Sequence, residues 1–306
     1  MSTSAAISDS MLSLLHANKK DQPMYLGVDI GGTNVVISTF NKEYSELSNT
    51  IYPTKDLVPG SIDFVTNLKR IIENHLDDSI KKIGVSFNCI VNDGVVVSSS
   101  ILGGMDINYP LVKELEAHFN RKVQLENDVI CQGKAELHFG YGKDAHSFVL
   151  VNIGTGLRLV YIVNNEVQKG WKGCLGEIFY MKRYIPELQR EVDLEKILSG
   201  RGLEKLYFYL SGSEKPTKEI IETVQTDDSA KEAVKIFINQ LTKLLTDISR
   251  YYNPQLIIFT GGVTRSSHLF LEKAIHDYDS TIHNFHRVDG IQVSELQNAA
   301  CLGAIL

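Results

Sequence analysis

The sequence contains few cysteines and only one tryptophan. Its four cysteines are spread widely over 306 residues and form no Cys-x-x-Cys pair; they are Cys89, Cys131, Cys174 and Cys301. This spacing excludes the common zinc motifs and offers no framework of disulfides. Unpaired thiols are typical of reducing compartments, so we expect a cytoplasmic protein.

Long apolar runs and an excess of positive charge are also missing. No stretch of about 18 apolar residues occurs, so we expect no membrane span. Residues 1–23 lack the basic start and apolar core of a signal peptide, and we interpret them as a lead-in. Acidic residues outnumber basic ones by 37 to 31, for a net charge of −6, which argues against a nucleic-acid partner. Apolar residues make up 43% of the chain, enough for the core of one large domain or two smaller ones.

Two widespread nucleotide-binding motifs are missing as well, although one stretch suggests them at first sight. Residues 25–40, "YLGVDIGGTNVVISTF", contain two adjacent glycines after an apolar run. A dinucleotide fingerprint requires a helix after its glycines, whereas the β-branched residues here favour a second strand. A Walker motif, which ends in Gly-Lys-Ser or Gly-Lys-Thr, does not occur. The stretch therefore predicts a β-hairpin whose tip is a glycine turn.

The pattern of an apolar strand followed by a glycine turn returns twice. Residues 147–163, "SFVLVNIGTGLRLVYIV", align with the first stretch, and residues 255–263, "QLIIFTGGV", supply a third strand and turn. Two similar hairpins predict a duplicated α/β architecture with one hairpin in each half. We expect the longest helix over residues 229–252, a helix of small residues at the C-terminus and a domain boundary near Asp128.

An acidic residue precedes the first turn. Leu26, Val28 and Ile30 share one face of the predicted strand, which leaves Asp29 on the opposite face beside the turn. A glycine turn lets backbone N–H groups approach an anion, but an acid beside it repels a phosphate unless a cation lies between them. Mg²⁺ is bound in this way, through few protein ligands and phosphate oxygens. Taken alone, the turn is equally typical of an ordinary tight hairpin.

Three glycine turns in one chain favour a site for a magnesium nucleotide over three unrelated turns. Asp29 would hold the Mg²⁺ through water, and the turns would approach the phosphates, the ribose and the base. The predicted nucleotide-binding residues are Asp29, Gly31, Gly32, Thr33, Asn34, Gly154, Thr155, Gly156, Gly261 and Gly262.

The order of the motifs "DIGGTN", "END", "GTG", "GE" and "TGG" resembles the ROK family (repressors, open reading frames, kinases) of the actin-like ATPase superfamily. The resemblance extends from about Met24 to Leu306. It implies two α/β lobes of the actin-like (ribonuclease H-like) type around a cleft that holds ATP and Mg²⁺, with a hexose on the side of the smaller lobe. The smaller lobe would comprise residues 24–127, completed by residues 297–306, and the larger lobe residues 128–296.

The resemblance also assigns roles in phosphoryl transfer to a sugar hydroxyl. Asp128 corresponds to the general base, Asn127 to a sugar-binding residue and Glu177 to a glutamate that binds sugar hydroxyls. From the sequence alone, an aspartate between a strand and a helix is more typical of an N-cap. Glu177 alone is more typical of an exposed residue after a loop. The family assignment reverses both preferences.

The acceptor end departs from the family pattern. Tyr180 stands where most members have a histidine, and no cysteine-rich loop follows, so we expect no structural zinc. Ile101 replaces a sugar-binding asparagine, whose polar role Asn88 or Asp106 could take over. These changes favour an amino or otherwise modified hexose over plain glucose as the acceptor.

Two further residues have open interpretations. Arg158, just after the second turn, could pair with a phosphate or lie on an exposed strand face, and we favour the exposed face. Trp171, the only tryptophan, could line the acceptor pocket or pack in the core.

We therefore expect a carbohydrate kinase that uses ATP and Mg²⁺, has a small-molecule sugar substrate and binds neither nucleic acid nor membrane. Dimers are common among the relatives, and the sequence leaves a homodimer open. One alternative is a sugar-responsive transcriptional regulator, which the acidic balance and the lack of a helix-turn-helix pattern disfavour. Another is a non-catalytic sensor, which the retained Asp29 and Asp128 disfavour.

Overall fold

The structure is a computed structural model that describes residues 22–61, 63–104 and 107–306. The predicted N-terminal lead-in, residues 1–23, lies outside the described residues except for its last two. Asp106, one of the predicted acceptor residues, lies outside them as well.

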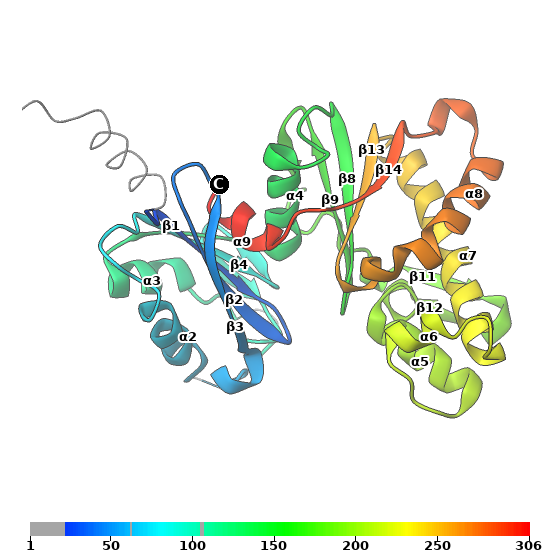
Figure 1. Ribbon diagram of the computed structural model, residues 1–306, viewed down its shortest axis with the longest axis horizontal. Helices are drawn as coiled ribbons and strands as arrows, with labels where there is room; N and C mark the ends of the chain where they lie inside the picture. Colours follow the sequence, from blue (N-terminus) through cyan, green and yellow to red (C-terminus); the bar gives the residue numbers. More distant parts are fainter. Residues whose placement is uncertain (1–21, 62, 105–106) are drawn as a thin grey trace, which may run out of the picture. The chain divides into compact units, whose positions relative to one another are not determined.

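The chain forms two compact units, each built on a five-stranded sheet with helices (Figure 1). The first unit extends to Ala135 and takes in Gln297–Leu306 at the other end of the chain. The second unit comprises Glu136–Leu296. The chain therefore leaves the first unit once and returns to it, so that this unit is assembled from both ends of the described sequence.

The first unit contains mostly short strands and a few helices. Its strands are β1 (Tyr25–Ile30), β2 (Asn34–Phe40), β3 (Glu46–Pro53), β4 (Lys82–Phe87), β5 (Ile90–Asn92), β6 (Val95–Ser98) and β7 (Lys122–Asn127). Its helices are η1 (Thr54–Leu57, a 3-10 helix), α2 (Asp63–Glu73), α3 (Leu111–Phe119), the first part of α4 (Asp128–Phe139) and α9 (Ala299–Ala304).

The second unit is richer in helix. Its strands are β8 (Ser147–Ile153), β9 (Leu157–Val163), β10 (Glu166–Gln168), β11 (Lys182–Ile185), β12 (Arg190–Asp193), β13 (Leu256–Thr260) and β14 (Gly290–Val293). Its α-helices are α5 (Gly200–Ser211), α6 (Thr217–Glu222), α7 (Asp228–Tyr251) and α8 (Leu271–Thr281). Its 3-10 helices are η2 (Ile178–Tyr180), η3 (Pro186–Leu188), η4 (Leu194–Lys196), η5 (Gly262–Leu269) and η6 (Asn284–His286).

The two large sheets have the same topology. The strand orders are β3-β2-β1-β4-β7 and β10-β9-β8-β13-β14. In both, the first three strands pair antiparallel and the remaining two join in parallel. The turn between β1 and β2 and the turn between β8 and β9 thus occupy equivalent positions. The duplicated α/β architecture, with one glycine hairpin in each half, is observed as predicted.

The first sheet is covered by helices on both faces. Leu26 and Val28 of β1 are fully buried in one core with Phe64 and Leu68 of α2, and each such side chain contributes roughly 1.5–3 kcal/mol to folding. On the other face α9 lies against β1 and β4 (Figure 1). Its backbone comes so close that a Cβ on Gly84 would lie 2.3 Å from a carbonyl oxygen of α9. Strand alternation places Asp29 on this second face.

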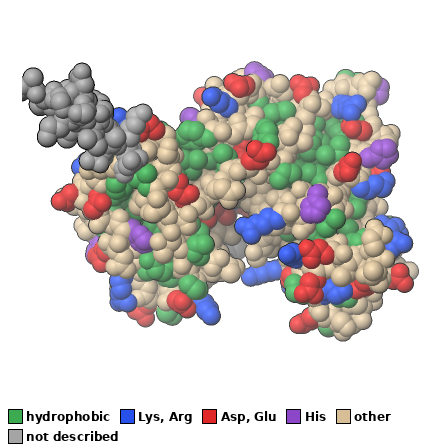
Figure 2. Space-filling view, viewed as in Figure 1, with side chains coloured by type: hydrophobic (Ala, Val, Ile, Leu, Met, Phe, Trp, Pro, Cys, Tyr) green, Lys and Arg blue, Asp and Glu red, His purple; other side chains and the backbone are tan. Residues whose placement is uncertain are grey.

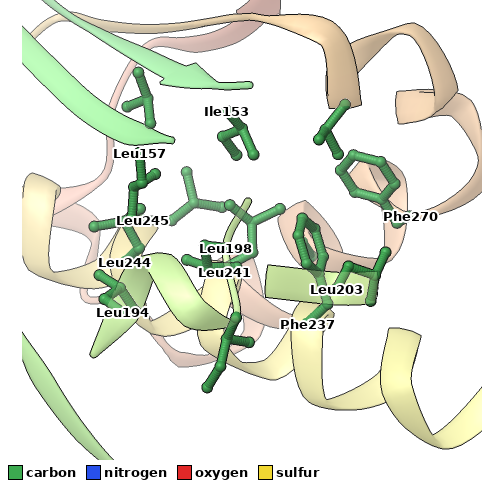
Figure 3. Packing of buried hydrophobic residues seen from close by; sticks show 14 of the residues in the cluster. Ile153, Leu157, Leu194, Leu198, Leu203, Phe237, Leu241, Leu244, Leu245 and Phe270 are labelled. Atoms are coloured by element: carbon green, nitrogen blue, oxygen red, sulfur yellow. The ribbon is translucent and has the colours of Figure 1, made fainter. Parts of the chain in front are cut away.

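The core of the second unit lies directly under the second glycine turn. Ile153 and Leu157, which flank the turn, pack in the same cluster as Phe237 and Leu241 of α7 (Figure 3). Helix α7 is the longest described helix and lies within one residue of its predicted bounds. Because apolar side chains bury both ends of the turn, the backbone between them is held in place.

The surface carries charges of both signs. Figure 2 shows Lys, Arg, Asp and Glu side chains mixed over the visible face of each unit. Within the part of the chain that the structure describes, no helix combines the length and the apolar character needed to cross a membrane.

Candidate active site

Asp29 is held by a serine of the neighbouring strand. β1 and β4 pair in parallel, in a register that places Asp29 opposite Ser86. The Ser86 hydroxyl donates a hydrogen bond of 2.6 Å to Asp29 Oδ1. Since Ser86 is fully buried, this bond fixes one carboxylate oxygen within the unit.

The surroundings of Asp29 favour its protonated form. Burial is the main cause that raises its pKa to about 7; the charge of Asp128 adds to the rise, and the hydrogen bond from Ser86 opposes it. The two predicted acids therefore lie within electrostatic reach of each other inside one unit. Two neighbouring carboxyl groups attract a cation when they are ionised, and oxygen ligands are those that Mg²⁺ prefers. The residues present thus fit the predicted Mg²⁺.

The first glycine turn is braced by Thr54. Gly31 N donates to the carbonyl oxygen of Asn34 (3.0 Å), Thr54 N donates to that of Thr33 (2.9 Å) and Thr54 Oγ1 donates to that of Gly31 (2.7 Å). A Cβ on Gly32 would find no described atom within 4 Å. Packing therefore does not explain the missing side chain of Gly32, which suits a backbone that a ligand approaches.

Asp128 is the first residue of α4 and follows Asn127, the last residue of β7. The helix is capped by Asn127, whose Oδ1 accepts hydrogen bonds from the backbone nitrogens of Val129 (2.9 Å) and Ile130 (3.2 Å). The sequence alone favours Asp128 as the cap, and that interpretation is wrong, because the preceding asparagine already satisfies the first N–H groups of the helix. Capping therefore does not account for an aspartate at position 128.

The amide of Asn127 is used inside the first unit. Its Nδ2 donates to the carbonyl oxygen of Cys89 (3.0 Å), and the residue is only 2% exposed. The bond to Cys89 uses one of the two N–H groups of Nδ2, and the predicted sugar-binding role of Asn127 stays a prediction. Asn88, the alternative polar residue, is exposed directly after β4, and its predicted role stays a prediction. The predicted role of Asp106 concerns a residue outside the described part of the chain.

In the second unit, the second and third glycine turns lie against each other. A Cβ on Gly261, whose φ is 101°, would lie 2.5 Å from the carbonyl oxygen of Ile153. Gly261 is therefore required by the fold, because no other residue allows this approach. A Cβ on Gly262 would meet no described atom within 4 Å. The turn is also joined to α5, since Gly200 N donates to the carbonyl oxygen of Gly154 (2.9 Å).

A cavity of about 270 Å³ opens beside these two turns. Helix α5 begins there, with Ser199 as its N-cap, and Arg201 and Lys218 add positive charge. Glycine turns, a helix N-terminus and basic side chains together suit a phosphate-bearing ligand. The cavity is lined by Gly154, Thr155, Gly200, Arg201, Glu204, Thr217, Lys218, Gly262, Val263 and Ser266.

The last glycine of the second turn has a different explanation. A Cβ on Gly156 would lie 2.8 Å from Oε2 of Glu195. The same oxygen accepts a hydrogen bond of 3.1 Å from Leu157 N. Gly156 therefore makes room for a carboxylate that supports the turn, so its small size is explained without a ligand.

Arg158 and Glu177 form an ion pair in the second unit. Arg158 Nη1 lies 2.8 Å from Glu177 Oε1, and their side chains are 11% and 20% exposed. The interpretation of Arg158 as a residue on an exposed strand face is therefore wrong: its strand face is covered, and its charge is paired with Glu177. The reading of Glu177 as an ordinary solvent-exposed residue is also wrong, for the same reason.

The segment around Glu177 carries exposed aromatic side chains. Trp171 is 97% exposed and Tyr180 is 71% exposed, so Trp171 does not pack in the core. Among the described residues, no group of three or more His, Cys, Asp and Glu side chains is placed to hold a metal ion together. The expectation that the protein lacks structural zinc stays a prediction.

Four positions of the candidate site were not recognised in the sequence. Ser86 had a weak signal, since it is a polar residue within the apolar stretch "KIGVSF". Ser199 and Gly200 also had a weak signal, because "SGRG" combines a good N-cap residue with small residues. Thr54 had none, since its role depends on where the chain after β3 crosses the first turn.

Comparisons with known proteins cover nearly all of the described chain. A model of the ROK family matches residues 25–306. The chain belongs to the ROK family. One curated ROK relative, the N-acetyl-D-glucosamine kinase of Haemophilus influenzae (strain 86-028NP), is 26% identical over 275 residues, which are 82% of this chain and 89% of the relative.

Solved structures show the same fold. A ROK family glucokinase from Streptomyces griseus, in complex with glucose and AMPPNP, has a TM-score of 0.76 at 21% identity and covers 92% of this chain and 98% of its own. A ROK hexokinase from Thermus thermophilus has a TM-score of 0.76 at 24% identity, with coverages of 92% and 96%. A ROK transcriptional regulator has a TM-score of 0.76 at 16% identity, with coverages of 98% and 82%.

These comparisons confirm the predicted family and the α/β fold of the two units. The curated kinases support the predicted enzyme class, a carbohydrate kinase.

Glycines that the fold does not need should be needed for the ligand. We expect Gly32→Ala and Gly262→Ala to change the unfolding free energy by less than about 0.5 kcal/mol, because neither new Cβ meets a described atom. Each should weaken the binding of ATP with Mg²⁺ about tenfold or more, equivalent to about 1.4 kcal/mol. Calorimetric titration and chemical denaturation measure the two effects.

Gly261→Ala is the matched control for these variants. It should destabilise the protein by roughly 2–3 kcal/mol, because its Cβ collides with the backbone and its φ is positive. Unchanged nucleotide affinity in both Gly32→Ala and Gly262→Ala would contradict the assignment of these turns.

Asp29 should make stability depend on pH. Its pKa rises from an ordinary value of 3.8 to about 7 on folding, so the folded state holds the proton more tightly than the unfolded state. Stability should therefore fall as the pH rises from about 4 to 7 and then level off. The free energy of unfolding of Asp29→Asn, relative to that of wild type, should rise by roughly 1–3 kcal/mol from pH 5 to pH 8.

Urea denaturation of the ligand-free protein at the two pH values measures this gain. Asp56→Asn, which changes an exposed aspartate of the same unit, is the control. Equal gains for Asp29→Asn and Asp56→Asn would show that the environment of Asp29 does not favour its protonated form.

Proposed function

We propose that this protein transfers the γ-phosphoryl group of ATP to a hydroxyl group of a hexose or a modified hexose, with Asp128 as the general base. The observation that carries this proposal is the placement of Asp128. It lies at the start of α4 within electrostatic reach of Asp29, and Asn127 supplies the cap that would otherwise account for an acid there.

The groups in the first unit have complementary tasks. The Asp128 carboxylate would accept the proton that the acceptor hydroxyl loses as it attacks the phosphoryl group. Asp29, oriented by Ser86, would hold the hydrated Mg²⁺, and the backbone around Gly32 would donate to phosphate oxygens. When bound, Mg²⁺ neutralises part of the phosphate charge.

The groups in the second unit suit the rest of the nucleotide and the acceptor. The turns at Gly154 and Gly262 border a cavity with basic side chains at the start of α5, which would take part of the nucleotide. Glu177 would accept hydrogen bonds from sugar hydroxyls. The named relatives act on N-acetyl-D-glucosamine and glucose, which supports a hexose or an amino or acylated hexose as the acceptor.

A regulatory role is the second candidate, because one structural neighbour is a transcriptional regulator. The two functions differ in a direct way. A kinase releases ADP when a sugar acceptor is supplied, whereas a regulator changes its affinity for DNA without turnover. A coupled ADP-release screen over hexoses, hexosamines and N-acylated hexosamines separates them.

Replacing Asp128 should slow turnover strongly while ligand binding persists. We expect Asp128→Asn to lower kcat about 10²- to 10⁴-fold, the usual loss when a general base is removed. The affinities for ATP and for the acceptor, measured by calorimetry, should change much less, because the asparagine retains the size of the side chain.

Asp144→Asn, which alters an exposed aspartate, should retain full activity. Wild-type turnover in Asp128→Asn would refute the assignment of the general base.

A further inference from the structure

The duplicated hairpins differ at one cross-strand pair in a way that matters for charge. In the first hairpin Asp29 pairs across the strands with Val36, and at the equivalent place in the second hairpin Asn152 pairs with Arg158. Residues directly opposite on paired strands have side chains on the same face. The second unit therefore has a permanent positive charge where the first unit has a valine.

The backbone fixes Glu177 beside this arginine. Leu159 N donates a hydrogen bond of 3.1 Å to the carbonyl oxygen of Gly176. Gly176 therefore lies beside Leu159, the residue of β9 that follows Arg158. Gly176 has a φ of 92°, and a Cβ there would lie 1.9 Å from the carbonyl oxygen of Leu159. Only glycine permits this approach. The close packing of Gly176 on β9 places the next side chain, Glu177, beside the guanidinium of Arg158.

The resulting ion pair is shielded from water. Nη1 of Arg158 is 2.8 Å from Oε1 of Glu177, with 11% and 20% of the two side chains exposed. The Nε of Arg158 is buried and has no hydrogen-bond partner among the described residues. Because water is largely excluded, neither charge is screened as it would be at the surface. The guanidinium also keeps its proton at any pH at which the protein is folded.

We propose that Arg158 is a specificity-determining residue that cancels the charge of Glu177 and so selects acceptors that are uncharged at this position. The inference rests on the proposed function, in which Glu177 binds sugar hydroxyls. A lone carboxylate would attract the ammonium group of an unacylated hexosamine. Beside the guanidinium that attraction is offset by repulsion, whereas a hydroxyl or an N-acyl group keeps its hydrogen bonds. The acceptor class is therefore a neutral hexose or an N-acylated hexosamine.

Pairs of sugars that differ in one group, neutral in one member and cationic in the other, test this selection. Glucose and glucosamine, and mannose and mannosamine, differ in one hydroxyl or ammonium group at carbon 2. At a pH one unit below the pKa of the amine, wild type should have the higher kcat/KM for the neutral member. Arg158→Gln should shift that ratio toward the cation by roughly 10- to 100-fold, as expected for one poorly screened charge. Arg158→Lys retains the positive charge and should keep the ratio within about threefold of wild type.

Arg183→Gln is the matched control. Arg183 pairs with Asp247 of α7 in the same unit, and its Nε also lacks a described partner. The variant removes a comparable ion pair, so it can lower stability, but it should leave the neutral-to-cation ratio unchanged. A shift as large as that of Arg158→Gln would overturn the inference.

A measurement on wild type avoids any folding defect in the variants. Relative to glucose, whose profile corrects for titration of the enzyme, kcat/KM for glucosamine should rise as the pH passes the pKa of the free amine. Binding without ATP, followed by calorimetry, should show the same trend. A flat ratio would overturn the inference while the kinase assignment stands.

Two other outcomes are decisive. If Arg158→Gln raises the KM for ATP and leaves the acceptor ratio unchanged, Arg158 serves the phosphates and the inference is wrong. If wild type neither binds nor phosphorylates any hexose, hexosamine or N-acylated hexosamine, the proposed function fails and the inference with it.

Discussion

Both groups of candidate site residues depend on one constraint, which is the parallel pairing of the central strands in each sheet. In the first unit this register places Ser86 beside Asp29. In the second unit it places β13 beside β8, so that the turns following them meet at Gly261 and Ile153. Because side chains alternate along a strand, a shift of one residue in either register would turn the polar groups into the core.

The two units share a topology but not a charge distribution. The first collects acids: Asp29, whose pKa is raised to about 7, lies within electrostatic reach of Asp128. The second pairs opposite charges at Arg158 and Glu177. A site with two neighbouring acids suits a divalent cation, whereas a compensated pair suits a neutral ligand. The same hairpin has therefore been adapted to two electrostatic tasks by substitutions on one face.

Much of the architecture was readable because it depends on local patterns. The alternation around Asp29, the glycines of the three turns and the period of the α7 helix each appear within a dozen or so residues. The site residues were less accessible. Asn127 and Asp128 are adjacent acceptors at the start of one helix, and either could cap it by sequence. Only the backbone geometry at the end of β7 shows that Asn127 does so.

The sequence by itself determined the strand–turn–strand hairpins, the family and the positions where side chains had to be small, because these follow from periodicity and from residue size. The tertiary structure decided which charges meet. Arg158 and Glu177 are 19 positions apart, and their contact depends on Gly176 lying against β9. Such contacts between segments distant in sequence arise only when the sheet is assembled, so no local pattern records them.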